Sequence, residues 1–264
     1  MALRFSPALQ NFIAEKGSWK DFFDNGSIEI YTGTQPATAD LAVTGTLLVT
    51  LTSSAGAKTN EIASQGTLTL DSGASGSVDT FTVNSIEIMG SSTAYNTSLT
   101  QTAADIALKC NRNPKNHLFH VTSSGAVITI TALPGMGTLP NGWVVAATYT
   151  TIAGTAANMG AGGAATAGVL AVNGLRMDYN AAAGVLTKDT TQTWSGTAVA
   201  TGTAGYFRYK SAVVDAGALD SSAVFMRMDG NIATSGANLN MSSTSITSGA
   251  LQTLSTFSFT VPAA

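Results

Sequence analysis

The sequence predicts a mainly β protein, in which a β-sandwich or jelly-roll-like outer domain is interrupted by a small inserted α+β domain. Most of the chain alternates apolar and polar residues in short runs, separated by turns of Gly, Ser and Thr. Helical spacing is confined to the start of the chain and to one segment near residue 100. Two stretches of small residues, 53–65 and 153–169, are typical of linkers and divide the chain.

The N-terminal segment is expected to be helical and is rich in aromatic side chains. Ser6 can cap a helix that starts at Pro7 and ends near Gly17, and a second short turn stops at Asn25. Large aromatic residues often dominate the energy of protein interfaces. Two interpretations are therefore open: the segment covers one end of the sandwich, or it is an arm that docks on a neighbouring subunit. The candidate interface residues are Phe5, Phe12, Trp19, Phe22 and Phe23.

The outer domain is predicted to comprise residues 1–58 and 170–264. Short apolar runs bounded by Gly and Thr turns are typical of sandwich strands. We expect strands at residues 28–31, 45–52, 184–188, 194–200, 205–210, 224–229 and 253–261.

The inserted module is predicted to comprise residues 66–152. Its helix begins at Ser98, places Leu99, Ile106 and Cys110 on one apolar face, and ends at Pro114. Insertions of this kind are tolerated because lengthening an exposed loop costs little entropy. We expect strands at residues 67–70, 80–83, 86–89, 118–122, 126–131 and 143–150.

Charge and cysteine content exclude several classes of protein. Only 27 of 264 residues are charged (12 Lys+Arg and 15 Asp+Glu), or 10%, whereas an ordinary soluble domain has roughly 25%. A net charge of −3 argues against binding to nucleic acid, and a single Cys rules out a disulfide scaffold. No apolar run approaches the roughly 18 residues of a membrane span, and we expect no signal peptide and no membrane partner. A weakly charged surface of Thr, Ser and Ala instead suits a homo-oligomer that packs against other subunits.

Three segments of the outer domain resemble a family of tailed-bacteriophage virion proteins, in the order found in that family. The first is residues 26–40 (GSIEIYTGTQPATAD) with 45–48 (GTLL). The second is residues 194–196 (WSG) with 200–208 (ATGTAGYFR), and the third is residues 228–246 (MDGNIATSGANLNMSSTSI). Together they cover most of the outer domain.

The insert is similar to a small module that recurs in phage structural proteins. The similarity lies in residues 75–79 (SGSVD), 95–106 (YNTSLTQTAADI) and 125–130 (GAVITI). The resemblance implies a non-enzymatic component of the virion, assembled in the bacterial cytoplasm. We expect an accessory head protein of the decoration or cement type, with a collar, head–tail or tail-surface position as the alternative. Its partners would be major capsid or neck and tail subunits.

Candidate metal and cofactor residues are few, and we expect no metal and no cofactor. Zinc sites need three or four ligands at set spacings, and Cys110, His117 and His120 are not backed by a second Cys or a third His. The residues 160–162 (GAG) superficially resemble a dinucleotide-binding loop but lie in a low-complexity segment without the strand and helix that such a loop requires.

Two other functions stay open as alternatives. A hydrolase would need paired carboxylates, and the candidates are Asp215 with Asp220 and Asp71 with Asp79, all in turn-like contexts. A host-surface glycan-binding protein would need an aromatic platform, for which the candidates are Tyr95, Trp143 and Tyr149 in the insert.

Overall fold

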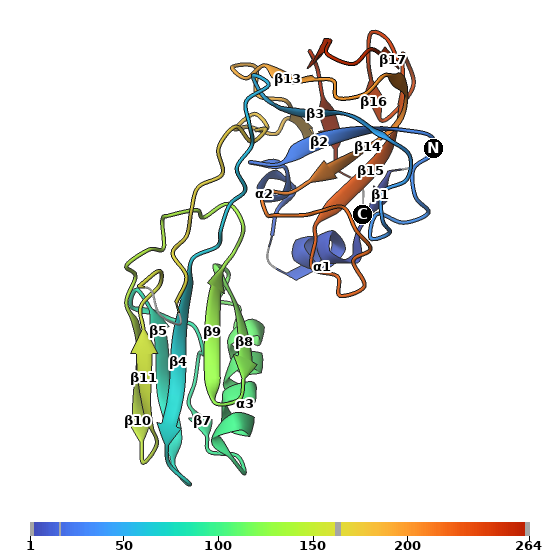
Figure 1. Cartoon of the computed structure of the whole chain (residues 1–264). Coiled ribbons are helices and arrows are strands. Elements are labelled where there is room, and N and C mark those ends of the chain that lie inside the picture. Colours follow the sequence, from blue (N-terminus) through green and yellow to red (C-terminus); the bar gives the residue numbers. More distant parts are fainter. Residues whose placement is uncertain (1–2, 16, 162–164, 262–264) are drawn as a thin grey trace. The chain divides into compact units, whose positions relative to one another are not determined.

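A computed structural model describes residues 3–15, 17–161 and 165–261 of the chain (Figure 1). The chain forms two compact units. The outer unit is Met1–Glu61 with Ala171–Ala264, and the inserted unit is Ile62–Leu170. Both are built largely from antiparallel strands, so the expected mainly β class is confirmed.

The segments expected to be linkers contain regular structure. Ser53 is the last residue of one strand and Gln65 the first of the next. Residues 153–157 form strand β11 (Ala153–Ala157), which pairs with β4 (Gln65–Ser72), so this part of the predicted linker 153–169 is wrong. Small residues are typical of linkers, but backbone hydrogen bonds hold β11 in its sheet whatever its side chains are. Residues 162–164 lie outside the described part of the chain.

One nine-stranded sheet forms most of the outer unit, with the order β1-β15-β14-β2-β3-β13-β18. The other two of the nine strands lie off this path: β16 pairs with β15 and β17 with β14. All of these pairs are antiparallel except β15–β16. The strands are β1 (Arg4–Phe5), β2 (Ser27–Thr32), β3 (Leu47–Ser53), β13 (Trp194–Thr197), β14 (Gly202–Lys210), β15 (Arg227–Ala233), β16 (Leu239–Asn240), β17 (Ser245–Ile246) and β18 (Leu251–Leu254).

A second layer covers one face of this sheet and makes the outer unit sandwich-like. It consists of α1 (Pro7–Glu15), α2 (Trp19–Phe23) and the two-stranded pair β12 (Val185–Thr187) and β19 (Ser258–Thr260). Ser18 caps α2 through a reciprocal capping box with Asp21, which satisfies two N–H groups that the helix start would otherwise leave unpaired.

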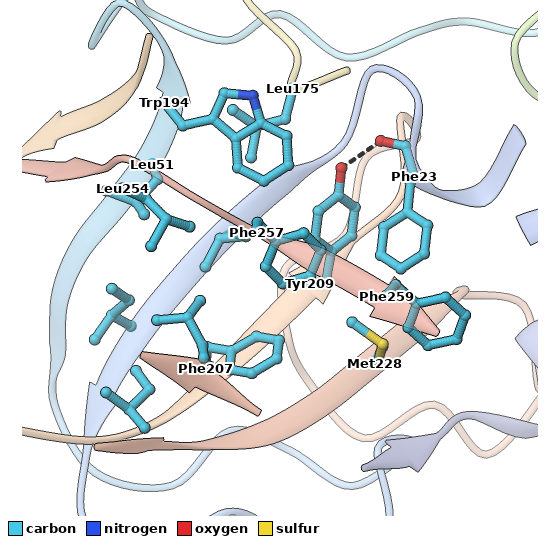
Figure 2. Close-up of a cluster of buried hydrophobic side chains, with 14 of the residues drawn as sticks. Phe23, Leu51, Leu175, Trp194, Phe207, Tyr209, Met228, Leu254, Phe257 and Phe259 are labelled. Atoms are coloured by element: carbon cyan, nitrogen blue, oxygen red, sulfur yellow. Dashed lines mark hydrogen bonds between the residues drawn. The ribbon is translucent and has the colours of Figure 1, made fainter. Parts of the chain in front are cut away.

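The core of the outer unit lies between these two layers and is dominated by aromatic rings (Figure 2). Phe23 lies 5.0 Å from the ring of Tyr209 and 5.0 Å from that of Phe259, centroid to centroid. The Tyr209 hydroxyl donates a hydrogen bond to the Phe23 carbonyl, and complete burial raises the pKa of this tyrosine well above its usual value. The aromatic N-terminal segment therefore contacts the sheet, through Tyr209, and the second layer, through Phe259.

The described residues of the inserted unit form two four-stranded antiparallel sheets and one helix around a second core. One sheet has the order β10-β5-β6 with β7 also paired to β5, and the other the order β11-β4-β9-β8. Its remaining strands are β5 (Ser77–Val83), β6 (Ile86–Glu87), β7 (Thr93–Ala94), β8 (Phe119–Ser124), β9 (Val127–Ala132) and β10 (Val145–Thr150). Asn84 and Ser85 have φ values of 49° and 66°, as the two-residue turn predicted between β5 and β6 requires.

The helix of the insert, α3 (Leu99–Arg112), begins and ends as the sequence predicts. Ser98 is its N-cap, with its side chain accepting from the Gln101 N–H at 3.1 Å. The helix packs against β8 and β9, and Ile106 and Cys110 are completely buried in the core. The apolar face predicted from the spacing is therefore the packed face.

Because each unit has its own core, we expect each to fold without the other. Thr59 pairs with Val172 and Ile62 with Val169, so the two chain segments that enter and leave the insert run antiparallel. Replacing residues 62–169 by Asn-Gly would close this pair with a two-residue hairpin. The shortened chain should keep a cooperative unfolding transition and the native fluorescence of buried Trp194.

The matched experiment expresses residues 62–170 alone and records its amide spectrum by NMR. Dispersed, sharp resonances are expected. A molten or unfolded NMR spectrum of the isolated insert would contradict independent folding. Loss of the cooperative unfolding transition in the shortened chain would contradict it as well.

Candidate functional site

The most distinctive polar feature of the outer unit is a charged sheet face opposite the aromatic core. Side chains alternate across a strand, so Phe207 and Tyr209 of β14 enter the core while Arg208 and Lys210 point to the other face. The same alternation brings Arg227 of β15 to that face. Together with Arg4 of β1, these residues place four of the 12 Lys+Arg residues on one sheet face.

The register arranges the first row of charges with alternating sign. Arg4, Asp229, Arg208 and Glu29 lie opposite one another on four successive strands. Arg208 binds Asp229 through two parallel bonds, Nε to Oδ1 and Nη2 to Oδ2, both 2.7 Å long. Both side chains have no exposed surface. Opposite charges directly across a sheet stabilise it, and bidentate pairs of this kind are the strongest.

The second row places two cations side by side and is neutralised from a loop. Lys210 and Arg227 are register partners, so their charges would repel. Asp215 of the loop 211–226 lies between them: its carboxylate accepts from Arg227 Nε at 2.7 Å and Nη2 at 2.6 Å, and its carbonyl from Lys210 Nζ at 3.1 Å. Lys210 also pairs with Glu29, at 2.7 Å. A loop carboxylate is thus required to complete the sheet face.

The loop 33–46 covers the same face by accepting hydrogen bonds through its carbonyls. Arg208 Nη1 donates to Leu41 O at 2.9 Å, and Arg227 Nη1 donates to Asp40 O at 3.2 Å and to Ala218 O at 2.8 Å. The hydroxyl of Tyr206 binds Thr44 O at 2.7 Å. The two arginines therefore join the sheet to both covering loops.

Burial and pairing act against each other on the pKa values of these groups. Burial alone would raise the pKa of Asp215, but hydrogen bonds from Arg227 and the Gly217 N–H lower it overall. Burial likewise opposes the charge of Arg208, yet its bonds to Asp229 raise the pKa of the guanidinium overall. Burial outweighs pairing at Asp229, whose pKa is raised, whereas the carboxylate form of Asp215 is favoured.

The structure separates the five predicted interface aromatics into two groups. Phe22 and Phe23 are completely buried in the core of their own unit. Phe5, Phe12 and Trp19 are half-buried and pack against that core, with the Phe5 and Trp19 rings 5.2 Å apart. The segment thus packs against the sheet of its own unit, and of the five rings only the half-buried ones retain surface that a neighbour could contact.

Two of the three predicted glycan-binding aromatics, Trp143 and Tyr149, lie far apart along the segment that contains β10. Trp143 precedes β10 and packs edge-on to Phe119, whereas Tyr149 lies six residues further along, about 20 Å at the rise of a strand. The hydroxyl of Tyr95 donates to the Thr97 carbonyl at 2.9 Å. Burial raises the pKa of Tyr149. Trp143 and Tyr149 could not stack on the same sugar ring.

The residues considered for metal binding do not converge. Cys110 is buried in α3, whereas His117 and His120 are exposed. In the described ranges, no group of three or more His, Cys, Asp or Glu side chains lies close enough to hold a metal ion. The glycine-rich segment 160–162 considered for a dinucleotide falls partly outside those ranges. Where the chain is described, no helix has the length and apolar character needed to cross a membrane.

The carboxylates considered for hydrolysis are each engaged locally. Asp215 binds Arg227, and the Asp220 carboxylate accepts from the N–H groups of Val224 and Phe225, the latter at 2.7 Å. Asp71 accepts from Thr155 at 2.6 Å. Asp79 accepts from Ser77 and Thr150, and these bonds lower its pKa. Neither pair forms an acid and base flanking a common cleft.

Comparisons of the chain with protein-family models, with curated proteins and with solved structures found no match. The resemblance to phage virion proteins therefore rests on the segments quoted above. The charged face was not singled out from the sequence. Its signal was present in residues 206–210 (YFRYK), where charged residues alternate with aromatic ones inside an expected strand.

We expect Arg208→Met to reduce the free energy of unfolding of the outer unit by about 3–5 kcal/mol, because Asp229 would be left buried without its counter-charge. The double variant Arg208→Met/Asp229→Leu removes both charges and should recover a large part of that loss. The free energies of unfolding of the single and the double variant are measured by urea denaturation, with tryptophan fluorescence as the signal. A Trp143→Phe background restricts the signal to Trp19 and Trp194, both in the outer unit. Equal losses in the single and double variants would contradict the pairing argument.

The outer unit should also lose stability in acid through Asp215. A carboxyl whose pKa is lowered on folding stabilises the native state above its unfolded pKa of about 3.9, and this contribution disappears as pH falls through the folded value. Asp215→Asn should therefore be less stable than the parent near pH 7 and show a smaller further loss on acidification. Asp178→Asn, in the same unit, is the control and should follow the parent. If Asp215→Asn lost as much stability on acidification as the parent, Asp215 would not be a source of the acid sensitivity.

Proposed function

We propose that this chain is a non-enzymatic structural component of a tailed-bacteriophage particle, and specifically an accessory head protein of the decoration or cement type. One observation carries the proposal: the segments that resemble the virion family are neighbours in a single sheet. Residues 26–40 and 45–48 contain β2, most of the loop 33–46 and the start of β3. Residues 200–208 contain most of β14, and residues 228–246 contain β15 from Met228 onward together with β16 and β17. These strands are hydrogen-bonded in the order β15-β14-β2-β3.

One of the two buried ion pairs of the charged face supports the same proposal, because both Arg208 and Asp229 lie inside those segments. Arg208 ends the second segment, Asp229 lies near the start of the third, and residues 33–40 and 45–46 of the covering loop belong to the first. The resemblance thus coincides with a structural unit that needs all three segments at once.

The exterior of the second covering loop suits burial against another subunit. Val214, Leu219 and Val224 are 64%, 58% and 63% exposed. Apolar side chains that are exposed in the free chain can be buried favourably against a neighbouring subunit. A cement or decoration protein needs such a surface against the subunits that it covers.

Mass spectrometry of purified particles, with cryo-electron microscopy, tests the proposal. We expect this chain in a copy number comparable with that of the major capsid subunit and density on the outside of the head. A small ring at the neck, or density along the tail, would instead support the collar, head–tail or tail-surface alternative. Absence from purified particles would contradict a virion role altogether.

Substitution of the exposed aliphatic residues should weaken attachment. We expect Val214→Asp/Val224→Asp to reduce incorporation into particles at least tenfold, because charged side chains would have to be desolvated on binding. The control Thr234→Asp/Ser235→Asp adds the same charge at exposed polar positions of the outer unit and should be incorporated normally. Circular dichroism confirms that both variants are folded. Equal incorporation of the two would exclude this loop as the contact.

A further inference from the structure

A small polar pocket lies beside the charged face of the outer unit. Its volume is about 240 Å³, room for roughly eight water molecules at about 30 Å³ each. One wall is charged or polar and the other is aliphatic. The lining residues are Ser27, Glu29, Thr50, Lys58, Asn60, Lys210, Val213, Val214, Asp215 and Ala216.

Lys58 is the one cation of this pocket without a carboxylate partner. Its Nζ donates to Asn60 Oδ1 at 2.7 Å and to the Ser211 carbonyl at 3.3 Å, both neutral acceptors. Within the described ranges, no carboxylate oxygen lies within 4.0 Å of this nitrogen. An ammonium has three N–H donors, and the two neutral acceptors use two of them. One donor of Lys58 is therefore left for a ligand.

The other charges that face Lys58 are already matched. Glu29 pairs with Lys210 at 2.7 Å, and Asp215 with Arg227 at 2.6 Å. These four charges sum to zero, so Lys58 adds one uncompensated positive charge. Burial, assisted by Lys210, lowers the pKa of Lys58 to about 8, although Glu29 and Asp215 act in the opposite direction. A nearby anion would relieve this cost.

We propose that this pocket receives a single carboxylate, presented by an acidic side chain or chain end of a neighbouring virion subunit. The inference rests on the proposed function for its partner. A monoanion matches the one uncompensated charge, whereas a phosphate dianion would add excess negative charge beside Glu29 and Asp215. The aliphatic wall of Val213 and Val214 suits the methylene stem that carries such a carboxylate.

The ligand chemistry is tested on the purified chain with sodium acetate as the probe. Lysine Cε–Hε NMR signals are followed at about pH 6.5, where the Lys58 ammonium is protonated, with chloride and sulfate at equal ionic strength as comparisons. We expect saturable acetate binding that perturbs Lys58, weakens at least tenfold in Lys58→Met and is partly restored in Lys58→Arg. It should disappear with a midpoint near pH 8.

The control Lys115→Met removes an exposed lysine of the insert and should leave acetate binding unchanged. Three results would overturn the inference: equal acetate binding in Lys58→Met, an equal or larger response to sulfate, or no pH dependence between about pH 7 and about pH 9. Because Lys58 is partly exposed, its substitution should leave the fold intact, and circular dichroism checks this.

The source of the carboxylate is tested on particles. Reduced incorporation of Lys58→Met, with normal incorporation of Lys115→Met, is the expected result. If wild-type chain is incorporated and Lys58→Met is incorporated equally, the neighbouring-subunit source is wrong while the virion role stands. If acetate binds but the wild-type chain is absent from particles, the virion role and this source fail, and the pocket is a site for a free carboxylate only.

Discussion

Two buried arginine–aspartate pairs hold the outer unit in its shape. Arg208 uses two of its donors on Asp229 of the neighbouring strand and a third on a carbonyl of the loop 33–46. Arg227 binds Asp215 of the loop 211–226 in the same bidentate way and also donates to both loops. A guanidinium has five donors in a rigid plane, so one side chain can fix a strand and a loop at once, which a lysine could not do. The cover of this sheet face is therefore polar, and its stability depends on every partner being present.

This use of charge explains the composition of the chain. The protein has few ionic residues, and two of its ion pairs, Arg208–Asp229 and Arg227–Asp215, are almost completely buried. The charge on its surface is consequently even lower than the total suggests. Exposed pairs contribute little to stability, so their scarcity costs the fold little. The scarcity of surface charge does weaken the electrostatic repulsion that keeps ordinary soluble proteins apart. A weakly charged surface is therefore suited to lasting contact with other subunits.

Local signals predicted the elements well because caps, turns and periodicity act over a few residues. Ser98 and Pro114 bound the helix of the insert, and Asn84-Ser85 adopts the left-handed conformations of a tight hairpin. The charged face could not be predicted in the same way. An alternation such as that of residues 206–210 usually means one buried and one solvated face of an antiparallel sheet. Only the loops that fold back over the arginines, from positions distant in sequence, convert the solvated face into a buried one.

The position of the insertion shows why the two units can be treated separately. Strand β3 leads into the insert, yet it pairs with β13, which follows it, at Ser53 opposite Trp194. The host sheet is thus continuous across the point of insertion, and the two connecting segments pair with each other at Thr59 and Val172. A loop whose ends already meet can be lengthened at little entropic cost. The residues proposed to contact other subunits, Val214, Val224 and Lys58, all belong to the host unit. Attachment would then not depend on the insert, which is free to differ in surface and role without disturbing the sheet that carries it.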